Sequence, residues 1–212
     1  MKRTPFGTFS PMFKATAGYL ELLNLATPGK RRAVSLAVKC CRASENPHQE
    51  IAEMLKEMDW RPHIVAAVAI AVLDFDQRSI HQLWAAIDGG SWVTPQLAAI
   101  AYLKDPQFAA CARTRIEARC PVYERFADST TESDGDCATG TKGTTIQVAK
   151  MAAALVRLVS LLPGPPEWIE TERSSPEILD LLSCDVDVSG NIAERWSVRL
   201  TTILRSLDIG LV

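Results

Sequence analysis

The apolar positions of this chain recur with helical spacing, and one phrase of that pattern is present twice. Trp60 precedes the apolar run Val65–Ile70, and thirty-two positions later Trp92 precedes a similar run, Leu97–Tyr102. Apolar residues three or four positions apart share one face of an α-helix. The repeat therefore predicts two similar helices, each of which begins close to a tryptophan.

A more polar, amphipathic stretch follows each apolar run, as in 78–88, where Ile80, Leu83 and Ile87 lie on one face. Polar residue–proline pairs such as Asn46-Pro47 are typical of helix starts. Sustained alternation of β-branched and aromatic residues, which would predict strands, is not found. The pattern predicts an all-α fold, with helices at 11–26, 28–42, 47–58, 62–73, 78–88, 95–103, 106–119, 146–162, 176–183 and 191–207.

Each predicted helix pair leaves an apolar face that only a neighbouring pair can bury. This favours stacked antiparallel helical hairpins, closed by a C-terminal helical cap. We expect a single domain over 1–212, with a repeat stack at 10–127, a flexible loop at 128–144 and C-terminal helices at 145–212. In such a stack Trp60 and Trp92 would occupy equivalent positions, each filling the groove between neighbouring hairpins.

The apolar helix that ends at Lys104 and is followed by Asp105-Pro106 resembles the junction of HEAT-type repeats. The segment Ala66–Leu73, followed by Asp74, is similar but lacks the proline. The resemblance covers roughly residues 59–119 and implies a HEAT-like α-solenoid. Because HEAT-like stacks generally serve as scaffolds and docking surfaces, the resemblance implies binding rather than catalysis.

Composition narrows the classes of function. The 212 residues are 47% hydrophobic and 23% charged, as in a folded domain, and the net charge is −2. A dedicated nucleic-acid binder usually has a basic excess, so nucleic acid is not an expected partner. The longest apolar run, Ile64–Leu73, is too short to cross a membrane. Six cysteines without a Cys-x-x-Cys pair indicate reduced thiols, and we expect a cytoplasmic protein.

Motifs that would carry chemistry are not found. The three histidines, His48, His63 and His81, form no metal-binding pattern, so we expect neither a metal nor another cofactor. No Gly-x-Ser-x-Gly motif marks a nucleophile. A pairing of Cys111 with His81 stays open, because sequence does not reveal proximity. We therefore expect a protein that is not an enzyme.

A basic cluster gives one candidate for partner binding. Arg113, Arg115 and Arg119 belong to the same predicted helix, and the last two are four positions apart and share a face. Such a face could hold an acidic partner or phosphates. The arginines could equally pair within the chain, with Glu117 or with the acidic residues of 132–136. We take the three arginines as predicted partner-binding residues.

Trp168 is the fourth predicted partner-binding residue. It follows two prolines in a segment that we expect to be irregular, where an exposed tryptophan would be a plausible interface hot spot. The expected function is a non-enzymatic protein–protein interaction module that binds another protein, either as an adaptor or as an inhibitory (immunity) protein. The alternative is a small helical enzyme or a nucleic-acid-processing protein that uses the Arg113–Arg125 face. The oligomeric state stays open.

Overall fold

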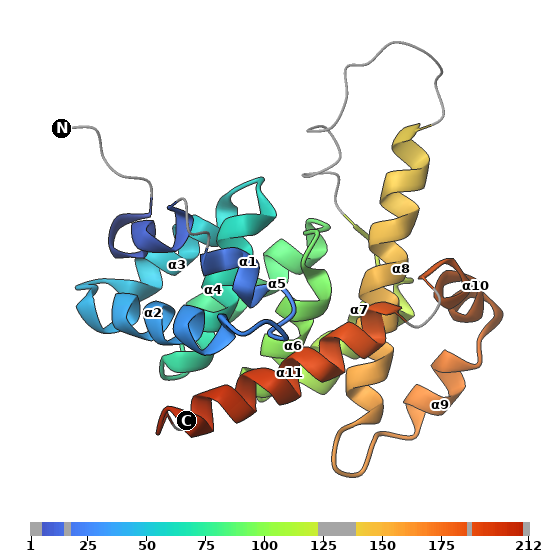
Figure 1. Cartoon of the computed structure of the whole chain (residues 1–212). Coiled ribbons are helices and arrows are strands. Elements are labelled where there is room, and N and C mark those ends of the chain that lie inside the picture. The colour runs from blue at the N-terminus through green and yellow to red at the C-terminus, as the bar shows by residue number, and fades with distance from the viewer. Residues whose placement is uncertain (1–5, 15–17, 123–138, 186–187, 210–212) are drawn as a thin grey trace.

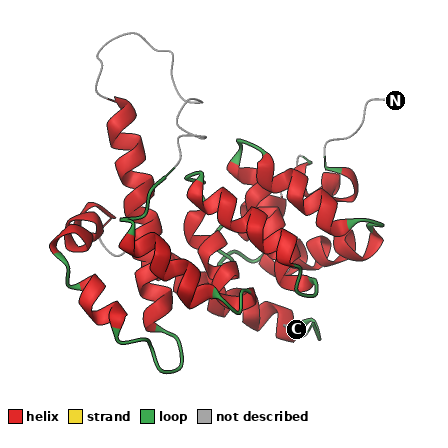
Figure 2. Cartoon of the chain, turned by 180° about the vertical axis from the view of Figure 1, so that it is seen from behind, coloured by secondary structure: helices red, strands yellow, loops and turns green. Residues whose placement is uncertain are grey.

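The computed structural model describes residues 6–14, 18–122, 139–185 and 188–209, apart from the side chains of 139–145 and 185. About 75% of the described residues are helical, and the same part of the chain contains no strand, as the sequence predicts (Figure 2). None of the described helices is long and apolar enough to cross a membrane.

A short 3-10 helix, η1, precedes eleven α-helices within these ranges (Figure 1). In chain order the elements are η1 (Gly7–Phe13), α1 (Gly18–Leu22), α2 (Lys30–Ala43), α3 (Pro47–Lys56), α4 (Trp60–Val72), α5 (Gln77–Asp88), α6 (Thr94–Lys104), α7 (Phe108–Glu117), α8 (Thr139–Ser160), α9 (Trp168–Arg173), α10 (Pro176–Asp185) and α11 (Val188–Ser206).

The N-terminal prediction is wrong in one respect. Instead of one helix over 11–26, the chain forms η1 and the short helix α1. Phe9 and Met12, which are both fully buried, are three residues apart, and a helix with three residues per turn places them on one face. The helices from α2 to α6 lie within a few residues of their predicted bounds.

Two further predictions need correction. The loop expected at 128–144 overlaps α8, which begins at Thr139, while residues 128–138 lie outside the described part. Gly140 and Gly143 suggested a loop, but intrinsic propensity is a weak guide where a helix continues into a packed segment. The segment around Trp168, expected to be irregular, forms α9, which is too short for its single buried residue, Ile169, to give a periodic signal.

Helices α4 and α6 form the centre of the molecule. Every residue of α4 from Pro62 to Ala71 is buried, and so is every residue of α6 from Thr94 to Ala101. Their small alanine side chains allow close approach from several sides. Helix α4 packs against α1, α2, α3, α5 and α6, and helix α6 packs against α4, α5, α8 and α11. An all-round apolar helix requires such cover.

The C-terminal helices close one side of this centre. Helix α8 packs against α6, α7, α9, α10 and α11, and helix α11 crosses α6 and α8 on the near side of the molecule (Figure 1). The largest fully buried side chain, Trp196 of α11, donates its Nε1–H to the Leu22 carbonyl at 2.8 Å. A polar group buried here needs such a partner, so this bond fixes α11 against the end of α1.

Candidate functional site

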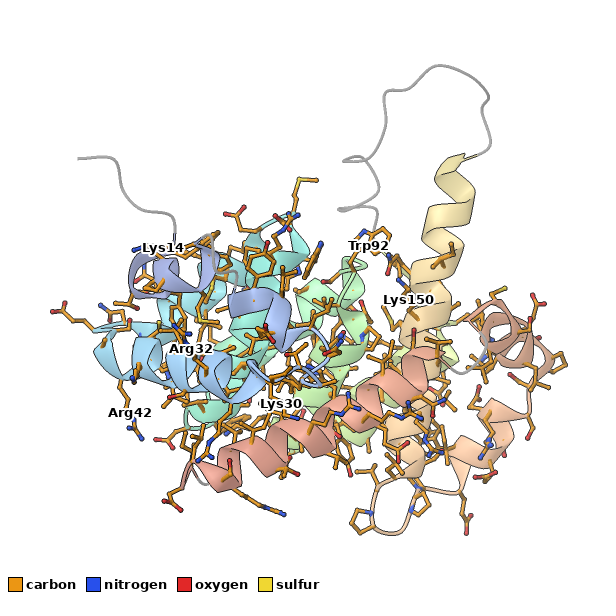
Figure 3. The ribbon with its side chains drawn as sticks, viewed as in Figure 1. Lys14, Lys30, Arg32, Arg42, Trp92 and Lys150 are labelled. Carbon is orange, nitrogen blue, oxygen red and sulfur yellow. The ribbon has the colours of Figure 1, made fainter. Side chains whose placement is uncertain are left out.

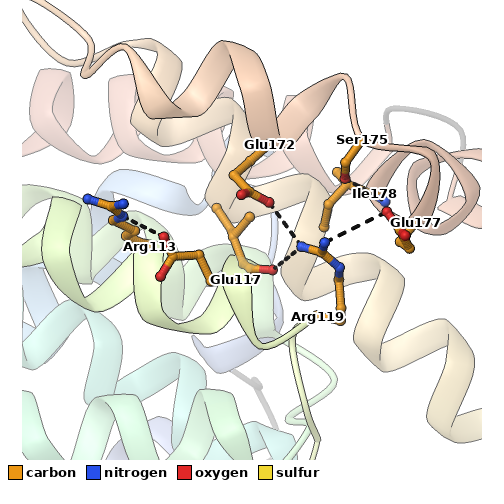
Figure 4. A network of polar contacts seen from close by, with 8 residues as sticks. Arg113, Glu117, Arg119, Glu172, Ser175, Glu177 and Ile178 are labelled. Atoms are coloured by element: carbon orange, nitrogen blue, oxygen red, sulfur yellow. Dashed lines mark hydrogen bonds and ion pairs between the residues drawn. The ribbon is translucent and has the colours of Figure 1, made fainter.

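The predicted arginine cluster lies at the end of α7, beside α9 and α10 (Figure 4). Arg113 Nε donates to Glu117 Oε1 at 2.6 Å within α7. Arg119 Nη1 donates to Glu172 Oε2 at 2.9 Å, and its Nη2 lies 3.7 Å from Glu177 Oε2. These ion pairs are half exposed, so each is worth little on its own. The two ion pairs of Arg119 connect the end of α7 to α9 and α10, the two helices that follow α8.

Arg115 points elsewhere, between α7 and α5. Its Nε and Nη2 donate to the two carboxylate oxygens of Asp88 at 2.6 and 2.7 Å, and the Arg115 side chain is only 17% exposed. The guanidinium also lies 4.1 Å from the centre of the Trp84 ring. A two-bond arginine–carboxylate pair stacked on an aromatic ring is well oriented. Arg115 therefore stabilises the packing of α7 on α5.

Trp168 begins α9 and is partly buried against the core. The Arg113 guanidinium lies 5.6 Å from the centre of its ring. The structure thus brings Arg113, Arg119 and Trp168 to one region, whereas Arg115 faces α5. It pairs Arg113 with Glu117, which is the intramolecular alternative that the sequence left open. Partner binding by these four residues stays a prediction.

A pocket of about 300 Å³ opens between α5 and α7. It brings together the two residues whose proximity the sequence left open, His81 and Cys111. Asp105, beside them, accepts hydrogen bonds from Trp84 Nε1 and from the Gln107 amide, both at 2.8 Å.

The thiol in this pocket is not prepared for nucleophilic attack. Burial and the neighbouring Asp105 carboxylate raise the pKa of Cys111, so the thiol is protonated at neutral pH. The carboxylate of Asp88 is already paired with Arg115, and that of Asp105 has two donors. These polar groups complete one another's hydrogen bonds, which is what the packing of α5 against α7 requires.

The turn between α5 and α6 has a defined geometry that the sequence did not reveal. Gly90 adopts φ +78°, its amide donates to the Ile87 carbonyl at 3.0 Å, and the Ser91 amide donates to the Ala86 carbonyl at 3.3 Å. These two bonds and the left-handed glycine form a Schellman motif, which ends α5. The motif sets the direction in which the chain enters α6, and with it the position of Trp92.

A buried histidine joins this turn to the turn between α3 and α4. His63, which is fully buried in α4, lies 2.8 Å from Ser91 Oγ through Nδ1 and 2.9 Å from the Glu57 carbonyl through Nε2. Desolvation lowers the pKa of His63 to about 4, so the ring is neutral at pH 7. Since Glu57 precedes Met58 and Ser91 precedes Trp92, this bridge places the two turns side by side.

Trp92 projects outward from the turn between α5 and α6 (Figure 3). Its side chain is 61% exposed, and Lys150 Nζ of α8 lies 4.7 Å from the ring centre. Trp60 has different surroundings: it is partly buried, and its ring meets Tyr19 edge-on at 5.9 Å. The expectation that both tryptophans fill equivalent grooves is therefore wrong. Among the described residues no hairpin covers Trp92, and most of its surface faces solvent.

Other exposed apolar side chains accompany Trp92. Met58, in the turn between α3 and α4, is 53% exposed. Ile146, one helical turn before Lys150 in α8, is 47% exposed. The Arg61 guanidinium lies 5.4 Å from the centre of the Trp60 ring. We define the turn surface by residues of the two turns, of the start of α4 and of α8, namely Met58, Trp60, Arg61, Trp92, Ile146 and Lys150.

No family model matches this sequence, and comparison with curated proteins and with solved structures gives no match.

Proposed function

We propose that this protein is a non-enzymatic interaction module of the cytoplasm that binds a partner protein through the turn surface. The observation that carries the proposal is the ring of Trp92, which is 61% exposed and has the Lys150 ammonium group 4.7 Å from its centre. Tryptophan, methionine and arginine are the residue types most enriched in the centres of protein interfaces.

The energetics of the turn surface favour a protein ligand. Burying an exposed tryptophan removes about 150 to 250 Å² of surface from water, which makes it the largest single apolar contribution a side chain can offer. The buried bridge from His63 to Ser91 holds the backbone of the turn in place. A pre-oriented aromatic ring loses little conformational entropy on binding, so more of its burial energy contributes to affinity.

The arrangement of the helices supports a scaffold. Helix α4 packs against α6 and α6 against α8, while α3 packs against α5. We interpret these contacts as antiparallel hairpins stacked in a HEAT-like manner, with α10 and α11 as the C-terminal cap. The described free thiols, among them the buried Cys40, Cys41 and Cys120, fit a reducing compartment. An adaptor and an inhibitory (immunity) protein both accord with this proposal.

The experiment places a photo-crosslinking amino acid at position 92 of the full chain, expressed in its native host. We expect a stoichiometric crosslink to one partner protein, which is then purified and its affinity measured directly. Trp92→Ala together with Met58→Ser should weaken that affinity at least about tenfold, since a central aromatic hot spot contributes 2 kcal/mol or more.

A matched variant tests where on the molecule the partner binds. Arg113→Ala together with Trp168→Ala alters the predicted cluster beside α9 by the same kind of truncation and should leave the affinity within about threefold. The opposite result, loss of binding in this variant and not in the Trp92 variant, would move the interface to α7 and α9. Crosslinking at position 92 that yields only adducts within the chain would count against the turn surface altogether.

A further inference from the structure

The charges of this chain are unevenly distributed. The sequence as a whole has 23 basic and 25 acidic residues, yet α2 and α11 together contain eight basic residues and one acidic residue. That acidic residue, Glu194, is already neutralised: Arg157 Nε and Nη2 donate to its Oε2 at 2.8 and 2.7 Å. The net charge of −2 therefore conceals a strongly basic region.

The basic residues of α2 share one side of the helix. At about 100° per residue, Arg31, Arg32, Lys39 and Arg42 fall within one third of the helix circumference, and all four are exposed. Lys30 precedes them in the first turn, and Figure 3 labels Lys30, Arg32 and Arg42 along this helix. The opposite side of α2 is apolar and packs on α4 and η1. No acidic residue interrupts the basic side.

Helix α11 continues the basic region. Arg195, Arg199 and Arg205 lie on its outer side, and Arg31 of α2 reaches the end of α11, where its Nη2 donates to the Ser206 carbonyl at 2.9 Å. We call the basic residues of α2 and these three arginines the basic surface. It extends along two helices of about 21 and 28 Å in length.

A pocket of about 280 Å³ on α11 gives the basic surface a defined recess. Arg195 and Arg199 line it, one helical turn apart, with the amide side chains of Asn24 and Asn191. Arg199 Nη1 donates to the Asn24 carbonyl at 2.8 Å, so this guanidinium is already oriented. Paired guanidinium groups present several N–H donors in a plane, which suits the oxygens of a phosphate better than lysine does.

We propose that the basic surface binds the phosphate backbone of a double-stranded nucleic acid, without reading its sequence. Six of the eight cations are arginines, which favours phosphate over a simple electrostatic attraction. A single strand would require exposed aromatic rings on which bases stack. Helix α2 has no aromatic residue, and the one ring of α11, Trp196, is 1% exposed. The duplex is therefore the form of nucleic acid that this surface fits.

The test measures fluorescence anisotropy of a labelled 20-base-pair DNA duplex and an RNA duplex of the same length with the full chain. We expect binding at 50 mM salt that weakens by about a hundredfold at 200 mM, the fall that corresponds to roughly four neutralised phosphates. Arg195→Glu with Arg199→Glu should weaken binding at 50 mM by more than about tenfold. Circular dichroism confirms that each variant folds.

Two further variants keep the result interpretable. Arg32→Glu with Arg42→Glu changes exposed side chains of α2 that form no ion pair in the described structure, and it should weaken binding to a similar extent. Lys56→Glu with Arg78→Glu makes the same change in net charge on α3 and α5, and it should leave binding within about threefold. An equal loss in this control would overturn the proposal, because it would show that only total charge matters.

Binding of competing ligands shows which class of molecule the basic surface binds. Absence of binding to both duplexes at 50 mM salt would overturn the proposal. So would tighter binding to single-stranded DNA, to polyglutamate or to vesicles containing phosphatidylserine, which would assign the basic surface to a single strand, an acidic protein or a membrane, respectively. A duplex affinity that exceeds all three, and that falls in both basic-surface variants, supports it.

Discussion

His63 Nδ1 and Ser91 Oγ lie 2.8 Å apart, although the two residues are 28 positions apart in sequence and belong to α4 and to the turn between α5 and α6, respectively. The other ring nitrogen faces the Glu57 carbonyl, which can only accept a hydrogen bond, so Nε2 carries the proton. Nδ1 then accepts from the Ser91 hydroxyl. A neutral imidazole thus forms a hydrogen bond with a residue of each turn. A protonated ring could no longer accept the hydrogen bond from the Ser91 hydroxyl and would place a positive charge in the core.

This arrangement predicts a specific loss of stability in acid. The pKa of His63 is about 4 in the folded protein and 6.5 in a solvated histidine, so below pH 6.5 the unfolded chain binds the proton more readily. The free energy of unfolding should therefore fall as pH drops from about 6.5 to about 4, by about 3 kcal/mol from this residue alone. Urea unfolding at several pH values measures the fall.

Two glutamine variants separate this effect from the titration of carboxylates. His63→Gln should flatten the pH dependence between 6.5 and 4, even though it lowers stability at pH 7. His48→Gln, which changes a partly exposed histidine near Asp76, should retain most of the slope, although it removes one of the groups that lower the pKa of Asp76. A slope that persists in His63→Gln would show that other groups cause it.

The ion pair of Arg115 with Asp88 should stabilise the fold more than that of Arg113 with Glu117. Arg115→Ala leaves a carboxylate that is 23% exposed without its partner, and we expect a loss of about 2 kcal/mol. Arg113→Ala breaks a pair whose side chains are about half exposed, and we expect a loss below about 1 kcal/mol. Chemical denaturation of both variants tests the difference. Equal losses would contradict it.

Several parts of the fold follow from the sequence for a clear reason. Helices α4 and α6 lack a polar side, so only the middle of the molecule can accommodate them, and both are buried there. Asp76 directly precedes α5, and its carboxylate caps that helix by accepting from the Ser79 amide at 2.7 Å. Local hydrogen bonds and helical periodicity involve residues close in sequence, so a pattern reveals them.

The candidate site could not be predicted in this way. Trp60 and Trp92 occupy equivalent places in the repeat, but exposure depends on what the next hairpin covers, and that is a property of the assembled fold. The bridge from His63 to Ser91 joins two turns whose proximity no local pattern encodes. The basic surface was hidden for a related reason, because a net charge sums over all faces of the molecule.

Truncation of Trp92 and of Trp84 should lower the stability of the fold to very different extents. Trp92→Ala changes a side chain that is 61% exposed, and the free energy of unfolding should change by less than about 1 kcal/mol. Trp84 is 5% exposed, stacks on Phe108 at 6.1 Å and donates to Asp105, so Trp84→Ala should cost about 3 to 5 kcal/mol. Thermal unfolding measures both. A large loss in Trp92→Ala would show that its ring supports the fold.

The cysteines should react with iodoacetamide in an order set by burial. Among the described cysteines, Cys184 is exposed and should be modified first, with the partly buried Cys111 following more slowly. Burial raises the pKa of Cys41 and of Cys120 to about 12, so these thiols are both protonated and inaccessible in the folded protein. Mass spectrometry of timed samples should find them modified only after unfolding. Early modification of Cys120 would contradict its position in the core.

Two glycines with left-handed backbones differ in what surrounds them, and this difference predicts the effect of alanine. Both Gly90 (φ +78°) and Gly164 (φ +70°) would strain an added side chain by about 1 kcal/mol. At Gly164 a Cβ meets nothing within 4 Å, so Gly164→Ala should cost little more. At Gly90 a Cβ would lie 2.6 Å from Val122 Cγ1, so Gly90→Ala must also displace the chain that follows α7.

The effect of Gly90→Ala can also be measured on partner binding, because Gly90 lies next to the turn surface. Since Gly90 ends α5 in the Schellman motif that positions Ser91, its replacement should shift the Ser91 hydroxyl away from His63. We therefore expect Gly90→Ala to weaken partner binding through Trp92 as well as stability, whereas Gly164→Ala affects neither by more than about 1 kcal/mol. Denaturation together with the affinity measurement tests this. If Gly90→Ala lowered stability but left binding unchanged, Trp92 would not depend on the geometry of its turn.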